Sequence, residues 1–192
     1  TPLYSSAASD VYKRQTSITK SNAQGYGMVV WDRAFERVAD EYPDIGRRSL
    51  LVDAAAMEFV RRPGDFDVVV GSNLFGDILS DLAAIITGSI GLAASGNINP
   101  EGDYPSMFEP VHGSAPDIAV QNVANPRATI LSGAMMFRYS LSEPEIADML
   151  ERSVADVLGR CRTPDIMPTD ITSGLTLVGT DEMADAVIAG LS

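Results

Sequence analysis

Cysteine, basic residues and long apolar runs are all scarce in this chain of 192 residues. The single cysteine, Cys161, excludes an internal disulfide framework and fits a reducing cytoplasm. Fourteen Lys and Arg stand against 26 Asp and Glu, which argues against binding to nucleic acid or to an anionic membrane surface. No apolar run reaches the roughly 20 residues that span a bilayer, since Thr87 and Gly88 interrupt the best one. The expected partner is a small molecule.

The first 15 residues have neither helical nor strand periodicity, and they lack the apolar centre of a secretory leader. We expect residues 1–15 to be a disordered leading segment or an artificial remnant (a scar) joined to the natural sequence. From residue 16 the sequence changes character, and its 45% of hydrophobic residues is enough for a core. The length suits one domain or part of a larger one.

Residues 66–84 organise the rest of the chain. A short β-branched run at 66–70 predicts a strand, Gly-Ser-Asn at 71–73 a turn, and apolar residues at helical spacing from Leu74 to Leu82 a helix. Asp77 and Asp81 are four residues apart, so both carboxylates would project from one helix face beyond a strand's carboxyl end. Such a pair attracts a hard divalent cation, although taken alone it is more often two solvated carboxylates.

The remaining segments alternate between short strands and helices. Strands are predicted where residues 16–22 enter a turn and at 49–52, ahead of Asp53; helices are predicted at 28–42, 54–62, 125–139, 143–160 and 181–191. Glycine-rich residues 88–100 predict an extended crossing segment, and residues 106–117 a binding loop. Asn125 is a plausible N-cap, with Pro126 at the first helical position. The alternation predicts an α/β fold around a largely parallel sheet.

Four stretches together resemble the β-decarboxylating dehydrogenases, the family of the isocitrate, isopropylmalate and tartrate or D-malate dehydrogenases. They are TKSN at 19–22, VD at 52–53, SNLFGDILSD at 72–81, and EPVHGSAPDIA at 109–119 with ANP at 124–126. Within the family, NINPE at 97–101, YPSMFEP at 104–110 and TPD at 163–165 look most like the tartrate/D-malate branch. Isopropylmalate and isocitrate remain the rival substrates.

The resemblance implies an oxidoreductase that oxidises a 2-hydroxy acid with NAD and Mg²⁺ or Mn²⁺ and then releases carbon dioxide. Asp53, Asp77 and Asp81 match the family's metal carboxylates, and Lys20 matches its catalytic lysine. In the family, Asp53 and Lys20 act across the interface of a homodimer. Divalent ions of this kind take oxygen ligands and polarise a chelating hydroxy acid.

The resemblance also implies which residues bind the cofactor: His112, Gly113, Ser114, Ala115, Pro116, Asp117, Ile118 and Asn125. His112 would lie against the adenine, and Asp117 would accept hydrogen bonds from the ribose hydroxyls. Because that carboxylate would repel a 2′-phosphate, NAD is favoured over NADP. Cys161 has no second histidine to pair with, so we interpret it as a packing or surface residue.

By resemblance, the chain would have an incomplete isopropylmalate-dehydrogenase-like fold that lacks the N-terminal half. Residues 16–87 would be the later part of the central dimer and substrate domain, and residues 88–192 the C-terminal part of the cofactor-binding domain. Val120-Gln121 stands where the family usually has Gly-Lys. We expect the fragment alone to be inactive; the alternative is a non-catalytic piece that only assembles or binds nucleotide.

Overall fold

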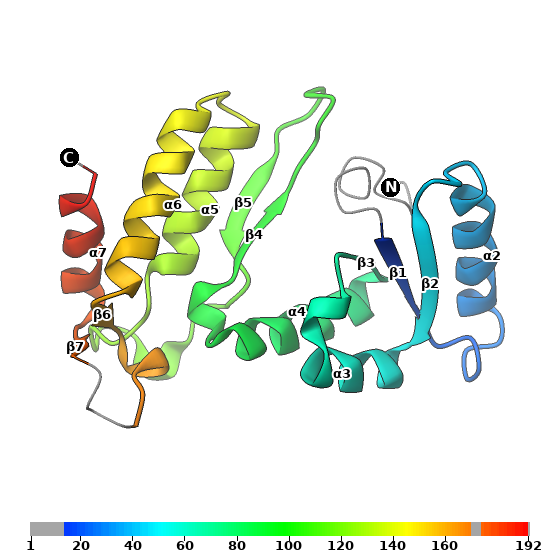
Figure 1. Ribbon diagram of the computed structural model, residues 1–192, viewed down its shortest axis with the longest axis horizontal. Helices are drawn as coiled ribbons and strands as arrows, with labels where there is room; N and C mark the ends of the chain where they lie inside the picture. The colour runs from blue at the N-terminus through cyan, green and yellow to red at the C-terminus, as the bar shows by residue number, and fades with distance from the viewer. Residues whose placement is uncertain (1–13, 170–173, 192) are drawn as a thin grey trace. The chain divides into compact units, whose positions relative to one another are not determined.

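The computed structural model describes residues 14–169 and 174–191, and it has the predicted α/β architecture (Figure 1). The chain divides into two compact units, one ending at Ile86 and one beginning at Thr87. Most of the predicted lead lies outside the described residues. Arg14 and Gln15, however, begin the first strand, so assigning them to the lead was wrong.

From residue 14 onward, the first unit is built on a parallel sheet of three strands. Strands β1 (Arg14–Thr19), β2 (Gly46–Leu51) and β3 (Val68–Val70) lie in the order β2-β1-β3. Parallel neighbours need a crossover, and the helices α2 (Gly27–Ala39) and α3 (Val52–Arg61) supply one after β1 and one after β2. The parallel sheet predicted from the alternation of elements is thereby confirmed in this unit.

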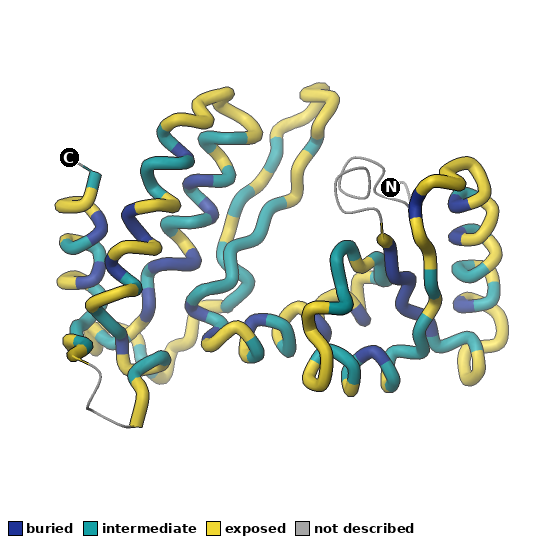
Figure 2. Tube along the Cα trace, viewed as in Figure 1, coloured by how far each residue is buried: buried dark blue, intermediate teal, exposed yellow. Residues whose placement is uncertain are grey.

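The core of the first unit forms where these elements and α4 (Asn73–Thr87) bury their apolar sides (Figure 2). One cluster joins Ile18, Met28, Ala55, Phe75 and Leu79; a second joins Phe35, Ala39 and Ile45. Burying each large apolar side chain contributes about 1.5–3 kcal/mol, so these clusters hold the helices to the central strand.

Several predicted boundaries in the first unit were wrong. The strand predicted at 49–52 spans Gly46–Leu51, and the helix predicted at 54–62 begins at Val52 and ends at Arg61. The helix predicted to reach Tyr42 ends at Ala39, and Tyr42 is 37% exposed in the turn that follows. The strand predicted from residue 66 begins at Val68. Phe66 instead stacks on Phe59, with 4.3 Å between ring centroids, and the Arg48 guanidinium lies 4.6 Å from the centre of the Phe66 ring.

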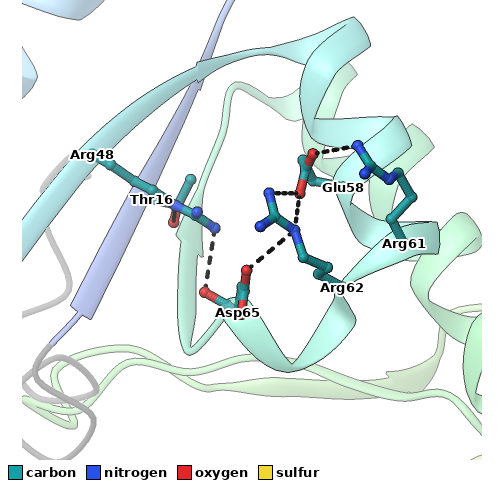
Figure 3. A network of polar contacts seen from close by, with 6 residues as sticks. All are labelled: Thr16, Arg48, Glu58, Arg61, Arg62 and Asp65. Carbon is teal, nitrogen blue, oxygen red and sulfur yellow. Dashed lines mark hydrogen bonds and ion pairs between the residues drawn. The ribbon is translucent and has the colours of Figure 1, made fainter.

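A polar network holds the segment that leads into β3. Figure 3 shows its members: Thr16, Arg48, Glu58, Arg61, Arg62 and Asp65. Arg48 donates to the Thr16 hydroxyl at 2.9 Å and to the Asp65 carbonyl at 3.2 Å, joining β2 to β1 and to the short helical turn Pro63–Asp65. Arg62 pairs with both Glu58 and Asp65. These contacts fix the approach to β3 more than they add stability, because exposed ion pairs contribute little.

In its described residues, the second unit contains three longer helices and two small sheets. Strands β4 (Ala94–Asn97) and β5 (Met107–Pro110) form an antiparallel pair that packs on α5 (Arg127–Tyr139). The helix α6 (Pro144–Leu158) packs on α5 and on α7 (Thr180–Ala189). Two short strands, β6 (Cys161–Arg162) and β7 (Thr176–Leu177), pair in parallel. Val154, Val157, Met183 and Val187 form the buried core.

The predicted binding loop at 106–117 and crossing segment at 88–100 are more ordered than expected. The loop opens with β5, and the crossing segment contains a helical turn, Ile90–Leu92, followed by β4. Glycine 96 permits this pairing, since a Cβ there would come within 2.9 Å of the Phe108 ring. Periodicity missed these strands because glycine and proline interrupt the apolar pattern.

The start of α5 also differs in detail from the prediction. Pro126 is the N-cap and Arg127 the first helical residue, while the Asn125 side-chain oxygen accepts from the Arg127 amide at 3.1 Å. Arg127 is fully buried and donates to the Cys161 carbonyl, which ties α5 to β6. Burial lowers the pKa of Arg127. None of the described helices has the length and apolar character needed to cross a membrane.

Candidate functional site

Lys20 and Asp53 meet at the carboxyl edge of the parallel sheet. Lys20 directly follows β1, and Asp53 lies in the first turn of α3, just after β2. The register pairs Thr19 with Leu51, which brings the two side chains together. The Lys20 ammonium donates to Oδ1 of Asp53 at 2.6 Å.

This contact controls the ionisation of Asp53. The hydrogen bond from Lys20 and backbone hydrogen bonds at the helix start hold the pKa of Asp53 below its usual value of 3.8. The carboxylate therefore stays ionised to a lower pH than an aspartate without these hydrogen bonds. The sequence placed both residues at strand ends but did not predict that they pair, because it does not show that the two strands are neighbours.

Asp77 and Asp81 both lie on α4, one turn apart, and both are exposed. The four-residue spacing puts their carboxylates on one helix face. The Asp77 carbonyl accepts from the Ser80 hydroxyl at 2.9 Å, a bond within the helix that leaves the Asp77 carboxylate outside it. The pair presents oxygen atoms of the type that Mg²⁺ and Mn²⁺ prefer.

The carboxylates of Asp77 and Asp81 are suitable ligands for a divalent metal, but two carboxylates are too few to hold one. Within residues 14–169 and 174–191, no three His, Cys, Asp or Glu side chains come together as a possible metal site. Asp53 is engaged with Lys20 instead of lying in a group with Asp77 and Asp81. One described chain thus offers part of an octahedral donor set, and further ligands would have to complete it.

A cavity of about 740 Å³ opens in the second unit, a size typical of small-molecule sites. Six of the eight residues predicted to bind the cofactor line it: His112, Gly113, Ser114, Ala115, Ile118 and Asn125. Pro116 and Asp117 belong to the same loop, in the helical turn Pro116–Ile118, but are not among the lining residues. The structure therefore gathers most of the predicted set on one surface.

The loop that forms the cavity wall carries unusual backbone conformations. Ala115, Val120 and Asn122 have positive φ angles of 40°, 58° and 56°, in the left-handed region. Val120 is fully exposed at the rim. A β-branched residue is costly in that conformation, which explains in physical terms why glycine is usual there in the family that the motif resembles.

Other parts of the second unit complete the cavity, and sequence reasoning did not assign them to it: Ser89, Gly91, Asn122, Asp165, Thr180 and Asp181. Asn125 donates from its side-chain amide to Oδ2 of Asp165 at 3.2 Å. A Cβ on Gly91 would lie 2.7 Å from the Asn125 Cβ, so Gly91 allows this close packing. These residues come together only in the fold; TPD at 163–165 was noted in the sequence only for its likeness to the tartrate/D-malate branch.

The lining is mainly apolar, and its charged side chains are acidic. Asp165 and Asp181 contribute carboxylates, whereas Lys and Arg are absent from the described lining residues. The His112 ring donates from Nδ1 to the Gly113 carbonyl at 2.9 Å, because a carbonyl oxygen only accepts. Such a surface suits a ligand that offers hydroxyl or amino donors, and it disfavours an additional phosphate at the same place.

Comparisons with known proteins identify the class of protein to which this chain belongs. The sequence model for isocitrate/isopropylmalate dehydrogenase matches residues 4–187. The match covers nearly the whole chain. The chain belongs to the isocitrate/isopropylmalate dehydrogenase family.

Particular relatives refine the comparison. A 3-isopropylmalate dehydrogenase of Synechococcus sp. is 46% identical over 181 residues, which is 94% of this chain and 47% of that protein. One of Chromohalobacter salexigens is 49% identical over 174 residues, or 90% and 46%. The crystal structure of isocitrate dehydrogenase from Methylococcus capsulatus superposes with a TM-score of 0.86 at 40% identity, over 95% of this chain and 52% of that one. The chain spans about half the length of these relatives.

Proposed function

We propose that this chain supplies the C-terminal half of an NAD- and divalent-metal-dependent dehydrogenase that oxidises and decarboxylates a 2-hydroxy acid. The observation that carries the proposal is the cavity lined by His112, the loop 113–115, Ile118 and Asn125. Its size and donor pattern suit the adenosine part of a dinucleotide. The carboxylates Asp165 and Asp181 favour NAD, because a 2′-phosphate near them would be repelled.

The charged residues of the first unit would perform the chemistry on the substrate. When bound, Mg²⁺ or Mn²⁺ would supply Lewis-acid chemistry to the hydroxy acid, and NAD would supply a hydride acceptor. Asp77 and Asp81 would hold the metal through their carboxylate oxygens, together with Asp53. Lys20 would hold and return a proton at its ammonium nitrogen, and its bond to Asp53 orients that nitrogen.

For the substrate we favour a 3-isopropylmalate-type hydroxy acid over tartrate or D-malate. The motifs at 97–101 and 104–110 had pointed to the tartrate/D-malate branch. The curated relatives at 46% and 49% identity are instead named 3-isopropylmalate dehydrogenase, which supports the alternative substrate.

We further propose that two copies form a homodimer that completes the site. Met57 and Val60 on α3 are 61% exposed, and Leu74, Ile78 and Ile85 on α4 are 56–61% exposed. Apolar side chains gathered on two helices favour association. A dimer would also supply the metal ligands that one described chain does not bring together.

The test joins this chain to the N-terminal half of its Synechococcus relative and measures NADH formation. With 3-isopropylmalate, NAD and Mn²⁺, the joined enzyme should be active, and tartrate, D-malate and isocitrate should be poorer substrates. Lys20→Ala and Asp77→Asn should abolish turnover. The 192-residue chain alone should produce no NADH, because positioning of the reacting groups would be lost.

A non-catalytic role is the competing function. It would be favoured if the joined enzyme were inactive with all four acids while the chain still bound NAD. Activity equal in wild type and Lys20→Ala would overturn the catalytic assignment.

A further inference from the structure

We propose that Asn122 is a positioning residue that clamps the wall of the cavity to the start of α7 and thereby sets the affinity for NAD. The inference rests on the proposed function, because it takes the cavity to be the NAD pocket. It gives a role in cofactor binding to Asn122 and to α7, neither of which the sequence motifs had assigned to the site. Asn122 itself lines the cavity, and its proposed role is to hold the neighbouring loop residues in place against the ligand.

Three groups of Asn122 bond to the first turn of α7. Its side-chain oxygen accepts from the Asp181 amide at 2.9 Å, and its carbonyl accepts from the Thr180 amide at 3.1 Å. Its side-chain amide donates to Oε2 of Glu182 at 3.4 Å. One residue of the loop thus holds three consecutive residues of the helix.

A second contact beside Asn122 strengthens the clamp. The Thr180 hydroxyl donates to the Ala124 carbonyl at 2.7 Å. Glu182 also accepts from the Gly179 amide at 3.1 Å, which satisfies another N–H at the helix start. The amides of Gly179, Thr180 and Asp181 are therefore used by the loop and by the Glu182 side chain, not left for an anion.

The backbone around the clamp is adapted to it. Asn122 has a φ of 56°, a conformation that asparagine tolerates better than most residues. A Cβ on Gly179 would lie 2.6 Å from the Asn122 carbonyl oxygen and 2.7 Å from its side-chain nitrogen. Only glycine at 179 allows the loop to approach so closely.

Both sides of the clamp border the same cavity. Asn122, Val123 and Ala124 line it from the loop, and Thr180 and Asp181 line it from the helix. The helix is itself anchored, because Met183 and Val187 are buried in the core of the second unit. A rigid helix therefore holds the segment that leads from Ile118 to Asn125, two of the predicted cofactor residues.

The experiment compares Asn122→Ala with Ser153→Ala in the joined enzyme. Ser153 bonds to the Val187 carbonyl at 2.6 Å, so its loss weakens the packing of α7 away from the cavity. The loss of the side-chain bonds in Asn122→Ala should raise the KM for NAD by about tenfold and leave kcat within about twofold. Ser153→Ala should lower the melting temperature without raising that KM. Asn122→Asp, which retains the acceptor for the Asp181 amide, should recover part of the affinity.

The results distinguish failure of the clamp from failure of the proposed function. An active wild-type joined enzyme, with the same KM for NAD in Asn122→Ala, would overturn the clamp and leave the proposed function standing. Equal rises in KM for Asn122→Ala and Ser153→Ala would reduce Asn122 to a general stabilising residue, which also overturns the inference. An inactive joined enzyme that does not bind NAD would overturn the proposed function, and the clamp with it.

Discussion

The Lys20 ammonium lies 2.6 Å from Oδ1 of Asp53, a bond that links two residues 33 positions apart in sequence. Each residue sits just beyond the carboxyl end of a strand, and the strands are neighbours. The lysine and the aspartate that we propose as a proton-transfer group and a metal ligand thus restrain one another. Metal bound by Asp53 would have to share that carboxylate with Lys20 or displace it.

The first prediction concerns the titration of Asp53. Since the bond to Lys20 lowers the pKa of Asp53 below 3.8, its stabilising effect is present above pH 3.8 and disappears as the pH falls through the lowered value. NMR titration of the side-chain carboxyl should show this lowered pKa. In Lys20→Ala the pKa should rise toward 3.8, whereas Lys20→Arg should keep it low. An unchanged pKa in Lys20→Ala would mean that the pair does not form in solution.

The second prediction concerns the choice of cofactor. Asp117 was predicted to exclude NADP, yet Asp165 and Asp181 are the carboxylates that line the cavity. In the joined enzyme, Asp117→Asn should lower the preference for NAD over NADP if the ribose lies at that loop. Asp181→Asn is the matched comparison, because it removes one charge from the lining. The ratio of kcat/KM for the two cofactors is the measurement, and no change in Asp117→Asn would show that Asp117 is misassigned.

The third prediction concerns the floor of the cavity. An added methyl in Gly91→Ala would approach the Asn125 Cβ to 2.7 Å and Oδ2 of Asp165 to 3.2 Å. Because both are side chains on the cavity surface, relief of the clash should displace them and weaken NAD binding. Gly133→Ala is the control, since a Cβ at Gly133 meets nothing within 4 Å. Isothermal titration with NAD should find weaker binding for Gly91→Ala alone; equal affinities would contradict the packing described.

The fourth prediction concerns backbone strain at Val120. Valine at a φ of 58° costs roughly 1 kcal/mol relative to a residue without a Cβ, and the side chain is fully exposed, so little packing is lost on its removal. Val120→Gly should therefore raise the free energy of unfolding by up to about 1 kcal/mol. Urea denaturation provides the measurement. Val30→Gly, a change at an exposed position inside α2, should have the opposite sign, because glycine disfavours helix.

The fifth prediction concerns association through α4. Ile78 is 56% exposed, and Ile78→Glu should raise the dimer dissociation constant by placing a charge in an apolar interface. Val30→Glu introduces the same charge at an exposed apolar position of α2 and should leave association unchanged. Sedimentation at several concentrations distinguishes them. A dimer that tolerates Ile78→Glu would place the interface elsewhere.

The sequence predicted those helices and strands in which apolar residues recur at a regular spacing. The helix from residue 73 could be predicted because Phe75 and Leu79 recur at helical spacing, and both are buried. The same period could not tell which face is covered, because Leu74 and Ile78 are also apolar and yet exposed. Predicted boundaries of helices and strands were wrong where a tertiary contact competes with the local sequence pattern. Phe66, for example, lies outside the strand and stacks on Phe59.

The cavity was predictable only on the side that one motif forms. Residues 112–118 are contiguous and carry the family's pattern, whereas Asp165 reaches Asn125 across 40 residues of sequence. Nothing local marks Asn122 as a partner of α7, since its left-handed conformation and its three bonds appear only in the folded chain. Spacing predicts which side chains share a face; it does not predict which loops dock on which helix starts.

The strand order β2-β1-β3 also has a consequence for the behaviour of this chain in solution. In the described part of the chain, β2 and β3 are the two borders of the sheet, and their outer N–H and C=O groups can recruit a foreign strand. On β2 the charged Arg47 and Arg48 discourage such recruitment, but β3 is Val68-Val69-Val70 with no charge, and Val69 is 38% exposed. Edge-to-edge aggregation would therefore start at β3, and its brevity of three residues, with Asp67 immediately before it, is the remaining protection against it.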